Sequence, residues 1–230
     1  MAFQAAQGRV YKRHIVLGAA YVLGVLTVGG AWAGPPTDQL RRDVERVLTI
    51  LEDPRLKKPG TLPERRSALR QIANEVFDLP EMAKRTLARH WQARTPAERA
   101  EFTRLFGDLL ERAYIARIDL YAGEKVAFVG ESIDGNHATV RTRIVTKQGS
   151  EIPVDYRMWR PEERWRAYDV AIEGVSLVAN YRSQFNAVIQ KSSYDGLVRA
   201  LKAKQGERVA GEAAQNARRA DGPARRSAPN

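Results

Sequence analysis

The chain has 230 residues, enough for one domain with a buried core and terminal extensions. It contains no cysteine, which excludes disulfides, thiol catalysis and metal sites built on thiolates. Its formal net charge of +11 points to an anionic partner, either a nucleic acid or an acidic membrane surface.

The first 33 residues have the pattern of a cleavable export signal. Three cations (Arg9, Lys12, Arg13) precede an uncharged apolar run over 15–28, and Ala31-Trp32-Ala33 supplies small residues at a cleavage site. A membrane-spanning helix needs about 20 apolar residues, and this run is shorter. The alternative interpretation is an uncleaved N-terminal membrane anchor. Removing 1–33 lowers the net charge from +11 to about +8, since no acid is lost. An exported protein rarely meets nucleic acid, so we expect membranes, anionic head groups or protein partners instead.

Apolar residues at helical spacing predict helices over 37–53, 61–77 and 79–90. Thr61 and Glu64 have the spacing of a capping box, which would open the second of these helices. A further helix is predicted over 95–121.

The start of that helix carries the clearest capping signal in the chain. Thr95 can cap, Pro96 suits the first helical position, and Glu98 completes the capping box.

The pattern then changes to alternation, which predicts four strands over 126–133, 137–146, 151–160 and 165–172. Short turn signals separate them, as in an antiparallel meander with one apolar face. A last helix is predicted over 175–204, with a break at 192–196.

The predicted fold class is therefore α+β: an antiparallel sheet of four or slightly more strands, with helices packed on one face. The domain covers 34–204. Residues 205–230 have almost no large apolar side chains and are predicted to form a disordered basic tail.

No constellation for catalysis is evident in the sequence. The three histidines (His14, His90, His137) have no metal-ligand spacing, and Ser176 is not in a nucleophile elbow. Phosphate-binding and dinucleotide-binding loops are also missing. We therefore expect no enzyme, no metal and no cofactor, and a hydrolase is disfavoured because no serine is paired with a histidine.

Two segments resemble one protein family closely. They are the block from Trp165-Arg166-Ala167-Tyr168-Asp169-Val170 through Glu173-Gly174-Val175-Ser176-Leu177, and Tyr181-Arg182-Ser183-Gln184-Phe185. Upstream, Phe77-Asp78, Met82-Ala83, Trp91, Thr95-Pro96 and residues 102–114 follow in the same order. The chain is thus similar, over roughly 38–204, to the MlaC-like family, also called the toluene-tolerance or ABC-transporter auxiliary family.

The resemblance implies a periplasmic carrier whose helices and sheet enclose an apolar cavity for phospholipid acyl chains. It also implies two partners: an outer-membrane lipoprotein–porin complex and an inner-membrane ABC transporter. Bound lipid would be cargo, and a monomer is expected. Two features depart from the family: His90 stands before Trp91 where many members have glycine followed by an aromatic residue, and the tail is rich in arginine.

Two alternatives stay open within this class. A related branch carries or adapts hopanoid-type lipids, and an adaptor of an ABC transport system could bridge complexes without binding lipid.

A carrier must offer its cargo an apolar environment close to that of the bilayer. A diacyl lipid has about 30 methylenes, each worth about 0.8 kcal/mol on leaving water, or about 25 kcal/mol in all. The same apolar faces would also form an ordinary core. The predicted cavity residues are Phe106, Leu110, Tyr114, Val140, Ile144, Val154, Tyr156, Met158, Val170, Val175, Val178 and Phe185.

Among these, Val175 is the first choice, because it lies where the last strand gives way to the last helix. Asp169 is interpreted as structural, holding a turn or a backbone amide.

The basic residues have two interpretations each. Arg141, Arg143, Arg157 and Arg166 are predicted to lie on the outer sheet face, where they steer docking to acidic partners or serve solubility alone. In the tail, Arg218, Arg219, Arg225 and Arg226 could touch anionic lipid at about 1 kcal/mol each, or be solvated without a role.

Overall fold

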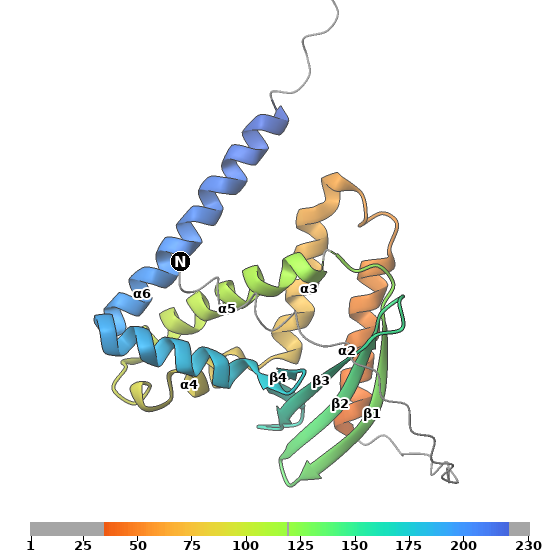
Figure 1. Cartoon of the computed structure of the whole chain (residues 1–230), viewed down its shortest axis with the longest axis horizontal. Coiled ribbons are helices and arrows are strands. Elements are labelled where there is room, and N and C mark those ends of the chain that lie inside the picture. The colour runs from red at the N-terminus through yellow and green to blue at the C-terminus, as the bar shows by residue number, and fades with distance from the viewer. Residues whose placement is uncertain (1–34, 119, 221–230) are drawn as a thin grey trace, which may run out of the picture. The chain divides into compact units, whose positions relative to one another are not determined.

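The computed structural model describes residues 35–118 and 120–220, with the side chains at 59, 115–117 and 206–220 excepted. The predicted export signal and residues 221–230 of the predicted tail lie outside the described residues. Figure 1 shows helices gathered around one antiparallel sheet, which confirms the predicted α+β class. Among the described residues, no helix combines the length and the apolar character needed to cross a membrane.

The helices occupy the first half of the domain and its C-terminal part. They are α2 (Pro35–Glu52), α3 (Leu62–Val76), α4 (Leu79–Leu87), α5 (Pro96–Ile118) and α6 (Leu177–Ala220), with short 3₁₀ turns η1 (Pro59–Thr61) and η2 (Ala88–His90).

The sheet is a meander with the strand order β1-β2-β3-β4-β5. Its strands are β1 (Lys125–Asp134), β2 (His137–Val145), β3 (Glu151–Trp159), β4 (Arg166–Ile172) and β5 (Val175–Ser176). The four predicted strands are confirmed. The two-residue β5 was not predicted; it folds back on β4 through Gly174, whose φ of 79° suits a tight turn.

The two edges of the sheet differ. Beside β4, Phe77 forms a parallel bridge to Ala167, and the Asp78 amide donates to the Ala167 carbonyl at 2.9 Å. β1 forms the opposite edge and carries a bulge between Phe128 and Gly130. The edge beside β4 is therefore covered by Phe77 and by the short β5, whereas no strand among the described residues pairs with the outer edge of β1, which is irregular.

Two packed regions form the interior of the domain. The first, the sheet core, lies where α2 and α3 cover one face of the sheet (Figure 1). Its buried members are Leu40, Ile72, Val76, Ala138, Val140, Met158, Trp165 and Ala167.

The second region is an aromatic cluster between α5 and α6. Phe106 meets Tyr181 and Phe185 edge-to-face, with ring centroids 5.4 and 5.8 Å apart. Phe102 stacks 6.0 Å from Phe106 and meets Phe185 at 5.6 Å. These four rings are almost completely buried, so the cluster is dry core.

α6 is kinked at the predicted break. Ser192 and Ser193 are non-helical, and Ser193 has φ 65°. Beyond the break, the Tyr194 hydroxyl donates to the Glu98 carbonyl at 3.1 Å, so the second segment also packs on α5. It continues as helix to Ala220, whereas the sequence predicted a disordered tail from residue 205. Alanine, glutamate, glutamine and arginine dominate 205–220 and are strong helix formers.

The capping predictions had different outcomes. The Thr95 amide donates to Glu98 at 2.7 Å, and the Glu98 amide donates to the Thr95 hydroxyl at 3.3 Å, which confirms that capping box. The box at Thr61 was wrong. The Thr61 hydroxyl donates instead to the carbonyls of Arg55 and Lys58, each at 2.9 Å, and so closes the preceding loop.

Candidate functional site

The twelve predicted cavity residues fall into three groups by burial. Seven are buried, four are half-buried, and Val175 is exposed. The buried seven are Phe106, Val140, Val154, Met158, Val170, Val178 and Phe185, and the half-buried four are Leu110, Tyr114, Ile144 and Tyr156.

The buried group belongs largely to the two packed regions. Phe106 and Phe185 are in the aromatic cluster, while Val140 and Met158 are in the sheet core. These four side chains are covered by other protein side chains.

The half-buried group includes apolar side chains on the second half of α5. Leu109 is 7% exposed, and beyond it Leu110, Ala113 and Tyr114 are all half-buried. The Arg70 guanidinium on α3 holds this part of α5 by donating to Glu111 at 2.8 Å. Apolar surface therefore persists on α5 where the aromatic cluster ends.

Tyr156 on β3 lies against the sheet core but is only half-buried. Burial raises the pKa of its hydroxyl, as expected for a phenol surrounded by protein. Its side chain nevertheless keeps accessible surface, although it pairs with buried Val140 and Val170 on the neighbouring strands. Tyr156 therefore packs against the sheet core without being fully covered.

The inner sheet face becomes less buried toward the end at which β1 begins. Ala138 and Val140 are buried, whereas Ile144 and its neighbours Val126 and Ile152 are half-buried. Val126 and Ile152 were not among the predicted residues. Their alternation in predicted strands was a signal that could have included them.

Val175 lies on β5, with 42% of its surface exposed. Asp169 fixes the neighbouring start of α6, because it accepts from the Val178 amide at 3.0 Å and the Ser176 hydroxyl at 2.6 Å. The structural role predicted for Asp169 is thereby confirmed. Ser176 in turn accepts from the Ala179 amide at 3.0 Å, so its hydroxyl serves the helix start.

Two surface hollows lie beside α3. The polar hollow has a volume of about 670 Å³ and the smaller one about 320 Å³. Ser67, Arg70, Gln71, Asn74, Glu75, Pro161, Glu162, Arg164 and Arg166 line the first; Arg46, Thr49, Ile50, Ala68, Gln71 and Ile72 line the second. None of the twelve predicted residues lines either hollow.

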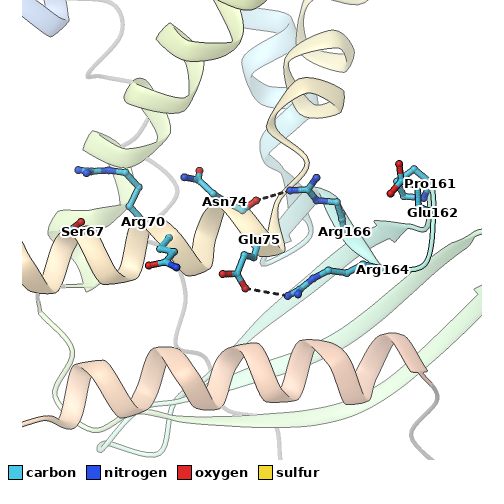
Figure 2. A pocket seen from close by; sticks show the side chains of 9 residues that line it. Ser67, Arg70, Asn74, Glu75, Pro161, Glu162, Arg164 and Arg166 are labelled. Atoms are coloured by element: carbon cyan, nitrogen blue, oxygen red, sulfur yellow. Dashed lines mark hydrogen bonds and ion pairs between the residues drawn. The ribbon is translucent and has the colours of Figure 1, made fainter.

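The four arginines assigned to the outer sheet face are not equivalent. Arg141 and Arg143 are exposed there, and Arg143 pairs with Glu151 at 2.6 Å. Arg157 is also exposed and pairs with Asp169 at 2.9 Å. Arg166 differs from the prediction: it turns toward α3 and donates to the Asn74 carbonyl at 2.6 Å, as Figure 2 shows.

The described residues contain no group of three or more histidine, aspartate and glutamate side chains placed to hold a metal. His90 contacts the Asn186 side chain at 3.1 Å, and His137 meets the Tyr168 ring edge-to-face at 6.1 Å. Each of these two histidines therefore contacts a side chain from another part of the fold.

Comparison with known proteins identifies the family. The family profile described as "MlaC protein" matches residues 41–203, most of the chain. The chain belongs to the MlaC family. The predicted family resemblance over 38–204 is confirmed with nearly the same bounds.

Two proteins of known description are similar to this MlaC-family chain. It is 22% identical over 138 residues to the intermembrane phospholipid transport system binding protein MlaC of Haemophilus influenzae, a match that covers 58% of this chain and 64% of that protein. The phospholipid-binding protein of Ralstonia solanacearum, solved in complex with a phospholipid, is similar with a TM-score of 0.68 and 26% identity. This likeness covers 75% of the present chain and 97% of the Ralstonia chain.

Proposed function

We propose that this protein is a periplasmic phospholipid carrier without catalytic activity. It holds acyl chains between the second half of α5 and the half-buried part of the inner sheet face. The observation that carries the proposal is a set of side chains that stay half-buried on the second half of α5 and on the inner sheet face, namely Leu110, Tyr114, Ile144 and Tyr156. The family, and the phospholipid in the Ralstonia relative, support the same cargo.

The wall of this space has the chemistry that acyl chains require. Leu110 and Tyr114 lie on the helix side, and Ile144, Ile152 and Tyr156 lie on the sheet side. Transfer of about 30 methylenes from water is worth about 25 kcal/mol, so nearly complete apolar contact is needed for a lipid to leave a bilayer. The aromatic cluster and the sheet core then act as the rigid supports of the two walls.

The proposal includes exchange with membrane complexes on both sides of the periplasm. An outer-membrane lipoprotein–porin complex and an inner-membrane ABC transporter are the expected partners. The exposed Arg141 and Arg143 on the open sheet face are suited to acidic surfaces on such partners. The predicted export signal over 1–33 fits this compartment.

Native mass spectrometry of the protein purified from a Gram-negative periplasm, followed by lipid extraction, tests the cargo. We expect a mass excess that resolves into phospholipids. Hopanoid in the extract would change the cargo class, and a bare polypeptide mass would favour an adaptor that binds no lipid.

Substitution Val175→Glu tests the position of the site. If the site extends to the junction of β5 and α6, a charge at Val175 should reduce lipid occupancy at least tenfold, and the chain should stay folded because Val175 is exposed. Val129→Glu is the matched control, because Val129 is a similarly exposed valine in the β1 bulge. Equal lipid occupancy in both variants would contradict the assignment of Val175.

A further inference from the structure

The two hollows beside α3 adjoin each other but differ in chemistry. Gln71 lines both. On one side of it the lining is polar and charged. On the other, Ile50, Ala68 and Ile72 form an apolar floor. Together they are called the α2–α3 groove below.

The apolar end of the groove reaches the interior of the domain. Ile72 is a buried member of the sheet core, and Ile50 packs against that core while keeping surface of its own. Ala68 is also half-buried. The aliphatic stems of Arg46 and Gln71 border this end, as long side chains do over apolar surface. The groove therefore borders the sheet core at the seam between two helices.

A network of charges crosses the same seam. Arg46 donates twice to Glu75, at 2.7 and 3.3 Å, and joins α2 to α3. Arg164, from the turn before β4, donates to both oxygens of the buried Asp43 at 3.1 and 3.0 Å. A longer contact of 3.7 Å links Arg164 to Glu75. Arg46 lines the smaller hollow, whereas Glu75 and Arg164 line the polar hollow, and Figure 2 shows Arg164 reaching toward Glu75 on α3.

Two charges at the polar end remain available for a ligand. The Arg166 guanidinium donates to the Asn74 backbone carbonyl through Nη2, and it has no ion-pair partner among the described side chains. Glu162, on the facing turn, is exposed and has no ion-pair partner among the described side chains. A donor for a phosphate and an acceptor for an ammonium group thus line one hollow.

We propose that the α2–α3 groove binds a single alkyl chain and its zwitterionic phosphate head group. The alkyl chain lies over Ile50, Ala68 and Ile72. The phosphate meets Arg166, and the ammonium group meets Glu162. The volumes of about 670 and 320 Å³ fall in the range of small-molecule sites. This site is separate from the space beside Tyr156, and it deepens the proposed carrier function by giving the same class of molecule a second contact on the outer surface.

The absence of cysteine from the chain allows a direct test. In the full-length exported protein, Ala68→Cys places one thiol in the groove, and Ala100→Cys on the exposed side of α5 is the matched control. Lysophosphatidylethanolamine, kept below its critical micelle concentration, is the probe, and the rate of maleimide modification is the measurement. We expect at least tenfold protection of Ala68→Cys at saturation and no protection of Ala100→Cys.

Related probes separate the two ends of the groove. A monoacylglycerol of equal chain length and free glycerophosphoethanolamine should each need at least tenfold higher concentrations for the same protection. Arg166→Ala should weaken the lysolipid about 10- to 100-fold. If that variant does not fold, Glu162→Lys on the exposed turn should weaken it at least fivefold. Equal protection by monoacylglycerol would overturn the head-group assignment.

The cargo measurement keeps this inference distinct from the carrier function. Phospholipid found in the purified protein, together with an unprotected Ala68→Cys thiol, would overturn the groove and leave the carrier proposal standing. Protection at Ala68→Cys in a protein purified without cargo would support the groove and contradict the carrier proposal.

Discussion

The two halves of α5 both carry apolar residues at helical spacing, but they differ in their surroundings. In the first half, Phe102 and Phe106 are fully buried among the rings of α6. In the second half, Leu110 and Tyr114 continue the same apolar stripe but remain half-buried. Residue type therefore does not separate core from candidate binding surface on this helix. The separation comes from what the rest of the chain places opposite each half.

The largest expected effect is on the packed half. Phe106→Ala removes a ring that meets three others, and it should lower the free energy of unfolding by about 3–5 kcal/mol, measured by urea denaturation. Lipid occupancy per folded molecule should stay unchanged. A small loss of stability together with a loss of bound lipid would mean that Phe106 belongs to the lipid site and not to the packed core.

Leu110→Ala, on the second half, should have the opposite profile. Because Leu110 is half-buried, we expect a loss of only about 1 kcal/mol in unfolding free energy. Lipid occupancy, read by native mass spectrometry, should fall severalfold. A loss of stability equal to that of Phe106→Ala would mean that Leu110 is ordinary core.

The smallest effect concerns the cap that begins the packed half. The Thr95 amide, the Thr95 hydroxyl and Arg94 lower the pKa of Glu98 below its ordinary 4.5. A lowered pKa means that the carboxylate stabilises the fold above about pH 4.5, and that this contribution disappears as the pH falls through the folded-state value. Glu98→Gln should therefore be less stable than the wild-type protein at neutral pH, with a difference that shrinks in acid.

Thermal unfolding as a function of pH measures this difference. Glu163→Gln serves as the control, since Glu163 is exposed in a turn and has no ion pair among the described residues. A difference that grows in acid would contradict the assigned role of Glu98.

The sequence predicted most of the fold, because the signals for its elements are local. The box at Thr95 and Glu98, and the alternation in β2, β3 and β4, each depend on nearby residues. The capping box predicted at Thr61 does not form, because the Thr61 hydroxyl donates to the Arg55 carbonyl in the preceding loop. The short β5 has too few residues to carry any periodicity.

The candidate site was less predictable, because burial depends on distant partners. Tyr156 and Met158 are two positions apart on β3 and were predicted to share one face of the strand, yet Met158 is fully buried and Tyr156 is not. Likewise, the turn of Arg166 toward the Asn74 carbonyl joins residues 92 positions apart. No local pattern in the chain carries that information.

The bulge in β1 has a consequence for the protein at high concentration. An open edge strand offers unpaired backbone groups to any passing strand, and this is a common origin of aggregation. Here the bulge at Phe128–Gly130 interrupts the regular repeat that a second strand would need. Near it, the Thr37 hydroxyl donates to Glu131 at 2.6 Å and ties the edge to the start of α2. The irregular β1 edge therefore disfavours the pairing of a second chain's strand with this sheet.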